Sequence, residues 1–334
     1  AAKVDFNRDI RPILSENCFQ CHGPDAAKRK AGLRLDTRDG ATQLNDGVAA
    51  VDVANVAKSE LLVRITSTDP DSQMPPPESN SKLTPEQIQL LQRWVAEGAK
   101  YDQHWAFKPP VRHSLPTLTG AQRSWAQNAV DHFVAAKQAE LGLAPSPEAG
   151  RATLLRRVSL DLTGLPPTPD QLAAFVADTE PQAYERAVDR LLQSPHYGER
   201  WGRHWLDAAR YADSDGYSHD AARSIWPYRD WVIEAFNRDL PFDRFVVEQL
   251  AGDMLSEATL AQRIATGFHR NTQINTEGGV DREQFRIDSI YDRIATTGEV
   301  MFGLTFGCAQ CHDHKYDPIS QVEYYRLFAF FNNA

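Results

Sequence analysis

The stretch Cys18-Phe19-Gln20-Cys21-His22 decides how this chain is interpreted, and it has a counterpart near the other end, Cys308-Ala309-Gln310-Cys311-His312. Together the two stretches contain all 4 cysteines of the 334-residue chain. Cys-x-x-Cys-His is the attachment signature of c-type haem, in which both thiols form thioethers with the haem and the histidine binds its iron. The sequence therefore predicts two covalent haem c groups. The attaching residues are Cys18, Cys21, Cys308 and Cys311, and the proximal iron ligands are His22 and His312.

Paired cysteines also occur in zinc sites and in thioredoxin-like redox pairs. Two pairs can form one four-cysteine zinc site, but such a site does not require a histidine after each pair. The two pairs also lie almost the whole chain apart, which is unusual for a zinc ribbon. Haem attachment is therefore favoured over zinc at both motifs.

Length and composition narrow the class of protein. A chain of 334 residues suggests two or three domains, and a hydrophobic content of 42% is enough to build their cores. The formal charge of −9 disfavours a nucleic-acid partner. No apolar run approaches the roughly 20 residues that span a membrane, so no transmembrane segment is expected. The start Ala1-Ala2-Lys3 is typical of a mature exported chain without its signal peptide, and haem c is attached outside the cytoplasm. A periplasmic or otherwise extracytoplasmic location follows, with a removed lipid anchor left open.

Residues 1–101 are predicted to form a small class I cytochrome c domain. The first motif follows a short helix whose length is limited by Pro12. Thr84-Pro85-Glu86-Gln87 is a capping box that starts a closing helix bearing Trp94. The apolar face of the first helix is expected to comprise Phe6, Ile10, Ile13 and Leu14.

A class I cytochrome needs a second axial ligand on a loop before its last helix. Met74-Pro75-Pro76-Pro77 lies there, and a thioether is a soft ligand that raises the reduction potential of haem iron. We predict that His22 and Met74 coordinate the first iron. The alternative is an exposed methionine in a polar loop. Arg34, Arg38 and Arg64 are candidate partners of the haem propionates or, alternatively, ordinary surface charges.

The rest of the chain is predicted to be mainly α. Residues 102–125 are rich in Pro, Ser and Thr and are expected to form an extended linker. Residues 126–334 show helical periodicity, with capping boxes at Thr168 and Ser320. The expected fold is therefore a class I cytochrome c domain followed by a larger helical haem-binding domain.

The distal ligand of the second haem is not evident, because no Met-Pro loop accompanies the second motif. His204 shares a helix stripe with Trp201 and Trp205, and His269 stands at a break between a helix and a loop. Both are candidate ligands, and a five-coordinate or water-bound iron is the third possibility. An open iron position permits chemistry such as peroxide reduction, whereas a closed one restricts the haem to electron transfer. Met254 is interpreted as a packing residue, and His314 as too close to His312 to bind the opposite face.

Polar clusters offer weaker candidates. Asp213 to Asp220 resembles part of a calcium loop, but Tyr217 and Ser224 stand where an EF-hand needs oxygen ligands, so a looser calcium site competes with a solvated turn. A second group is either a substrate or metal pocket or a polar loop, and it comprises Asn275, Glu277, Asp281 and Glu283. A third group is either a sugar-stacking platform or helix-core packing, and it comprises Trp226, Tyr228 and Trp231.

Several stretches resemble known families in the same order along the chain. Residues 6–14, 18–25, 33–36, 74–76 and 94–99 resemble a planctomycete-type cytochrome c domain. Residues 160–167, 204–207, 226–231, 267–271 and 308–318 resemble the domain of unknown function that follows this cytochrome in multidomain proteins. The resemblance implies an exported haem protein whose relatives often continue into a further domain. It leaves the reaction open.

Three functional hypotheses follow. The first is a dihaem electron-transfer protein that passes electrons to a redox partner protein. The second is a haem-dependent oxidoreductase or peroxidase acting on a small or carbohydrate substrate. The third is a carbohydrate-binding module whose haems sense redox state.

Overall fold

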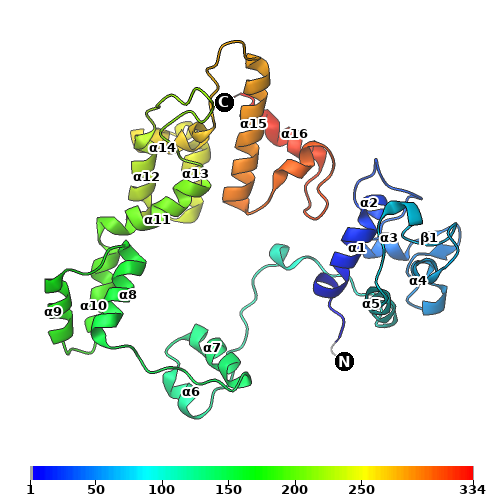
Figure 1. The fold of residues 1–334 in the computed structure, drawn as a ribbon, viewed down its shortest axis with the longest axis horizontal. Coiled ribbons are helices and arrows are strands. Elements are labelled where there is room, and N and C mark those ends of the chain that lie inside the picture. Colours follow the sequence, from blue (N-terminus) through cyan, green and yellow to red (C-terminus); the bar gives the residue numbers. More distant parts are fainter. Residues whose placement is uncertain (1–2, 334) are drawn as a thin grey trace. The chain divides into compact units, whose positions relative to one another are not determined.

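The computed structural model describes residues 3–333 and is mainly helical, as the sequence predicts (Figure 1). The chain divides into two compact units. Unit 1 contains Ala1–Pro110 together with Gly303–Ala334, and unit 2 contains Val111–Phe302. Unit 1 is therefore assembled from both ends of the chain, and unit 2 from the segment between them.

Unit 1 begins with the predicted short helix. A single π-helical turn, η1 (Phe6–Ile10), leads into α1 (Arg11–Asn17) and α2 (Phe19–His22). Pro12 occupies the first turn of α1, where the missing N–H leaves no hydrogen bond unmade. The predicted apolar face is confirmed, since Phe6, Ile10, Ile13 and Leu14 are all buried.

The closing helix of the cytochrome segment is α5 (Pro85–Ala96), and Thr84 and Gln87 form the predicted capping box. Trp94 is 2% exposed, and its ring centroid lies 5.9 Å from that of Phe6 and 5.2 Å from that of Tyr101. This aromatic cluster joins the first and last helices of the segment around one core.

Shorter elements lie between the two motif-bearing ends of unit 1. A short helix, α4, spans Glu60–Thr66. A small antiparallel hairpin, β1 (Leu44–Asn45) with β2 (Val48–Ala49), was not expected from the sequence. The remaining elements are α3 (Arg38–Thr42), η2 (Val56–Lys58), η3 (Pro77–Ser79), η4 (Trp105–Phe107), η8 (Phe306–Gln310) and α16 (Gln321–Phe331).

The C-terminal segment is held within unit 1 by its own contacts. Ser320 forms the predicted capping box of α16 with Glu323. Arg11 of α1 donates a hydrogen bond from Nη2 to the carbonyl oxygen of Tyr316, at 3.0 Å. Both Cys-x-x-Cys-His motifs consequently belong to the same compact unit.

Unit 2 is a succession of helices whose main packing is between α11 (Pro195–Ala208) and α12 (Trp226–Asn237). The predicted capping box at Thr168 is confirmed. The last six residues of the expected linker form a helix, so the prediction of extended chain is wrong there. The other elements are α6 (Gly120–Trp125), α7 (Ala129–Glu140), α8 (Arg151–Thr163), α9 (Pro169–Ala177), α10 (Ala183–Leu192), α13 (Phe242–Ala251), η5 (Gly252–Met254), α14 (Leu260–Ala265), η6 (Thr266–Asn271), α15 (Arg282–Thr297) and η7 (Gly298–Phe302).

Glycines make the close approach of α11 and α12 possible. Gly198 and Gly202 are buried, and the Gly198 N–H donates to Oδ1 of Asn237 at 2.7 Å. A methyl group on Gly198 would collide with the carbonyl oxygen of Ile233, whereas one on Gly202 would make ordinary contact with Val232 at 3.5 Å. The face of α11 that meets α12 is thus defined by small residues.

Candidate haem-attachment sites

The first motif forms one helical turn. The backbone N–H groups of Cys21 and His22 both donate to the carbonyl oxygen of Cys18, at 3.1 and 2.8 Å. Residues three and four apart lie on the same face of such a turn, so the two sulfurs and the imidazole face one side. All four cysteines of the chain are free of disulfides, Cys18 half-buried and the others exposed. The two thiols and the imidazole are therefore placed as covalent attachment of a haem requires.

The protonation of these groups suits attachment and ligation. Burial, with a smaller effect of Cys21, raises the pKa of Cys18 to about 12, so the unattached residue is a neutral thiol. Burial lowers the pKa of His22, the backbone of Lys30 opposes the shift, and the positive charge of Arg64 adds to it. The neutral ring is the form that binds iron. Nδ1 of His22 is buried without a well-formed hydrogen bond among the described residues.

Met74 is connected to the same site through α4. Its backbone N–H donates to the carbonyl oxygen of Arg64 at 3.0 Å, and Arg64 is the residue whose charge acts on His22. Met74 is half-buried and the following Pro75 is buried, so this is not the fully exposed methionine of the alternative interpretation. Arg64 is bound to Glu60 at 2.7 Å, and Arg34 to Asp36 at 2.5 Å. Two of the three candidate propionate partners thus already have carboxylate partners.

The second motif lies on η8 and at its end. Cys308 and Cys311 are exposed, and His312 is half-buried. Nδ1 of His312 lies 2.7 Å from the carbonyl oxygen of Asp313. Because a carbonyl oxygen only accepts hydrogen bonds, Nδ1 must carry the hydrogen and Nε2 keeps its lone pair. Metal-binding histidines are oriented in this way, so the residue fits a proximal ligand.

α16 holds the second motif in place. Gln321 Nε2 and Tyr325 OH both donate to the carbonyl oxygen of Gln310, each at 3.1 Å. His314 is only 5% exposed, and its Nδ1 accepts from the backbone N–H groups of Tyr316 at 3.2 Å and Asp317 at 2.8 Å. His314 therefore organises the loop that follows the motif.

The two candidate distal histidines lie in unit 2, and their surroundings differ. His204 is exposed, with its ring 5.6 Å from that of Trp201, because the buried face of α11 is the one that carries the glycines. His269 is half-buried in η6, and burial, with a contribution from Arg293, lowers its pKa to about 4. Met254 is 82% exposed, so its interpretation as a packing residue is wrong.

The polar clusters are engaged in local structure. Asp213 accepts a hydrogen bond from Tyr211 OH at 2.6 Å, and Asp220 accepts one from the backbone N–H of Gly216 at 2.7 Å. Within residues 3–333 no group of three or more His, Cys, Asp or Glu is arranged to hold a metal ion. The structure thus lends no support to the calcium site or to a four-cysteine zinc site.

The polar side chains of the Asn275–Glu283 loop likewise form hydrogen bonds and ion pairs with nearby residues. Asn275 Oδ1 accepts from the backbone N–H of Glu277 at 2.9 Å, and Asp281 caps the N-terminus of α15. Glu283 is paired with Arg286 at 2.8 Å. These contacts favour the polar-loop interpretation over a pocket.

Of the three aromatic residues predicted as a group on α12, two lie in the core and one lies on the surface. Tyr228 and Trp231 are 1% and 6% exposed, so they are packing residues. Trp226 is 52% exposed and lies at an open groove, lined also by Asp230, Glu234 and Arg238. One aromatic ring of the three is thus available for stacking.

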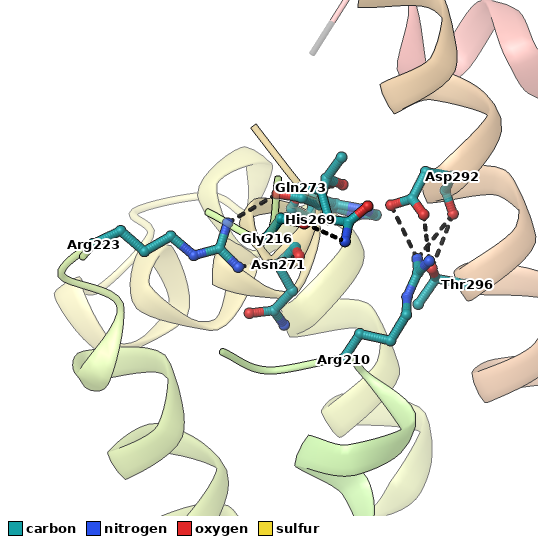
Figure 2. A network of polar contacts seen from close by, with 9 residues as sticks. Arg210, Gly216, Arg223, His269, Asn271, Gln273, Asp292 and Thr296 are labelled. Atoms are coloured by element: carbon teal, nitrogen blue, oxygen red, sulfur yellow. Dashed lines mark hydrogen bonds and ion pairs between the residues drawn. The ribbon is translucent and has the colours of Figure 1, made fainter. Parts of the chain in front are cut away.

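Unit 2 contains a polar network that no sequence pattern predicts (Figure 2). Arg210, at the end of α11, forms an ion pair with Asp292 of α15, which is 82 residues away. Arg223 donates from Nη1 to the Thr272 carbonyl oxygen at 2.9 Å and from Nη2 to that of Asn271 at 3.1 Å. Single charged residues so far apart give no periodic signal, so no sequence argument pairs them.

A helical Cys-x-x-Cys-His turn linked through α4 to a Met-Pro loop defines the class of the protein, which is a c-type cytochrome. The planctomycete cytochrome C family matches residues 18–78, which include all the predicted ligands of the first haem. The chain belongs to the family described as protein of unknown function (DUF1549), which matches residues 129–334. The predicted order of the two domains is confirmed, and the cytochrome domain implies covalent haem c with its iron.

The other comparisons found no relatives, since neither a curated protein nor a solved structure matches this chain. Across residues 3–333, no helix is both long enough and apolar enough to cross a membrane.

Proposed function

We propose that this protein is a dihaem electron-transfer cytochrome, with haem c on both motifs. The observation that carries the proposal is that both motifs belong to unit 1, and that each presents a histidine suited to iron. Arg11, which precedes the first motif, is hydrogen-bonded to Tyr316, which follows the second. Two redox groups in one unit support transfer between them.

The residues around the two motifs support unequal potentials. Bound haem supplies a one-electron couple. At the first site Cys18 and Cys21 fix the haem edge, His22 supplies a nitrogen donor, and Met74 supplies a thioether that raises the potential. No Met-Pro loop accompanies the second site. Electrons are therefore expected to pass from the second site to the first, and from there to a redox partner protein outside the cytoplasm.

Haem counting tests the proposal. The intact protein, expressed with a haem c maturation system, should contain two haems by pyridine haemochrome absorbance and by mass. The double substitutions Cys18→Ala with Cys21→Ala, and Cys308→Ala with Cys311→Ala, should each remove one. A potentiometric titration should show two waves. One haem in the wild-type protein, or loss of both haems from either variant, would contradict the proposal.

A second candidate function is glycan binding at α12, favoured by the exposed Trp226 beside a groove that also contains Asp230 and Glu234. Aromatic rings stack on sugar faces, and carboxylates accept hydrogen bonds from hydroxyl groups. Trp226→Ala should abolish binding to a soluble glycan panel, and Trp201→Ala, which removes a ring 38% exposed on α11, should not. Glycan retention that is equal in both variants would remove this candidate.

The oxidoreductase hypothesis requires an open iron position at the second site. Binding of cyanide to the ferric protein, followed optically, measures whether such a position exists. A spectrum that does not respond to cyanide would leave electron transfer as the function of both haems.

A further inference from the structure

The loop that follows the first Cys-x-x-Cys-His motif carries a run of three cations, Lys28-Arg29-Lys30. Residues 23–32, the basic loop, contain these three cations and a single carboxylate, that of Asp25. The chain has a formal charge of −9, so the basic loop is opposite in sign to the protein as a whole. A local charge of opposite sign steers charged partners towards one part of a protein surface.

The basic loop is fixed against the end of the motif that carries Cys21. The Lys30 backbone N–H donates to the carbonyl oxygen of Cys21 at 2.8 Å. The Arg29 side chain donates from Nε to the carbonyl oxygen of Gly23 at 3.0 Å and from Nη2 to that of Pro24 at 2.5 Å. These hydrogen bonds hold the three cations close to the site of haem attachment.

The charges of the basic loop remain available to a partner. Lys28 and Lys30 are exposed, and neither forms an ion pair within residues 3–333. The half-buried guanidinium of Arg29 is bound by two carbonyl oxygens and by no carboxylate of the described chain. Asp25 is half-buried and accepts a hydrogen bond from the backbone N–H of Ala27 at 2.9 Å. The loop therefore presents a net positive surface to solvent.

This positive surface lies on the accessible side of the first motif. Of the two attaching cysteines, Cys21 is exposed and Cys18 is half-buried. A partner can therefore approach the first site from the side of Cys21, where the basic loop is held. The second motif differs, because residues 313–322 contain two carboxylates, Asp313 and Asp317, and a single cation, Lys315. A positive loop thus distinguishes the first site from the second.

We propose that the basic loop is the surface on which the redox partner of the first haem docks, and that this partner is a protein with an acidic surface. Electron-transfer complexes have small interfaces, so a few charges are enough to guide a partner to the site and to orient it. The proposal rests on the proposed function in one respect, which is that electrons leave the protein at the first haem.

The sign of the salt dependence tests the charge that an oxidant meets at the first haem. Full-length, haem-loaded Cys308→Ala with Cys311→Ala isolates that haem, and stopped-flow absorbance follows the loss of one electron from its ferrous iron. Oxidation by ferricyanide, an anion, should slow by about threefold or more between about 0.01 M and about 0.15 M salt, whereas oxidation by the cation tris(phenanthroline)cobalt(III) should not slow. Ferricyanide oxidation that quickens with salt, as the net charge of −9 alone requires, would overturn the proposal.

Charge reversal locates the effect. In the same background, Lys28→Glu with Lys30→Glu should abolish the slowing by salt, because the loop then repels ferricyanide. Arg156→Glu with Arg157→Glu, at exposed positions of α8, changes the net charge by the same amount and should leave the slowing in place. Equal effects of the two double substitutions would contradict a docking surface at residues 28–30.

An acidic polypeptide distinguishes protein docking from attraction of small anions. At low salt, poly-L-glutamate should occupy the native loop and slow its ferricyanide reaction by about threefold or more, but should not affect Lys28→Glu with Lys30→Glu. Attraction of ferricyanide without competition from poly-L-glutamate would overturn the docking surface, since the loop would then attract small anions alone. Haem content and midpoint potentials test the proposed function separately, so a failure of either proposal is recognised by itself.

Discussion

Three histidines of this protein illustrate how one residue type is prepared for different tasks. His22 is kept neutral by burial and by Arg64. His312 is held with its Nδ1 hydrogen on a carbonyl oxygen, which leaves Nε2 as a donor to metal. His314, two residues later, uses Nδ1 to accept two backbone N–H groups and fixes a loop. The local hydrogen bonds, and not the sequence spacing, distinguish the candidate ligand His312 from its neighbour His314.

Met74→Ala should lower the midpoint potential of one haem and leave the other unchanged. The thioether is the group that raises the potential, and axial ligands span a range of roughly 0.8 V. Potentiometric titration with optical detection measures the shift. Met254→Ala is the matched control, because Met254 is 82% exposed and lies on unit 2. An unchanged pair of potentials in Met74→Ala would exclude this residue as a ligand.

His269 should make the stability of unit 2 depend on pH. Its pKa is about 4 in the folded protein, whereas an unfolded histidine has a pKa of about 6.5. Between these values the unfolded state binds more protons, so stability is full above about pH 6.5 and falls as the pH drops towards 4, by about 3 kcal/mol at most. Urea unfolding at pH 7.5 and 5.0 measures the difference. In His269→Gln the difference in free energy of unfolding between the two pH values should be smaller. If the variant loses as much stability as the wild-type protein, other groups cause the effect.

At the level of helices, the contact of α11 with α12 depends on two glycines one turn apart. Gly198→Ala should destabilise unit 2 by about 1–3 kcal/mol, because the added methyl collides with the Ile233 carbonyl and cannot be relieved by a side-chain rotation. Gly202→Ala should change stability by less than about 1 kcal/mol, since it meets Val232 at an ordinary distance and gains helix propensity. Thermal unfolding of both variants measures the contrast. Equal destabilisation would mean that the helices are not packed this closely.

Helix ends and buried stripes were predictable because they depend on neighbouring residues alone. The capping boxes at Thr84, Thr168 and Ser320 and the apolar face before the first motif are all confirmed. The environment of His204 was not predictable from the stripe of large residues around it. Gly198 and Gly202 form the buried face of α11. Because glycine has no side chain, a search for periodic apolar residues does not detect such a face.

Long-range features of the candidate sites were also beyond the sequence. The pairing of Arg210 with Asp292 arises only when α11 and α15 meet. The grouping of Gly303–Ala334 with the first 110 residues likewise depends on tertiary contacts, which periodicity and motif spacing do not encode. The motifs themselves were evident, because their chemistry requires fixed local spacing.

The molecule as a whole contains separate hydrophobic cores in its two units. One core surrounds Leu14 and Trp94 in unit 1, and another surrounds Val232 and Phe245 in unit 2. Urea unfolding should therefore show two transitions, one that haem absorbance reports and one that appears in far-UV circular dichroism alone. Gly198→Ala should shift only the second of these. Coincident transitions that move together in the variant would show that the two units unfold as one.

The discontinuous chain path of unit 1 has a consequence for the order of events during synthesis. Arg11 is synthesised early, and its partner Tyr316 follows 305 residues later. Unit 2 is continuous and can fold while it is being synthesised, whereas unit 1 is complete only when residues 303–334 join a first segment that already has its own core.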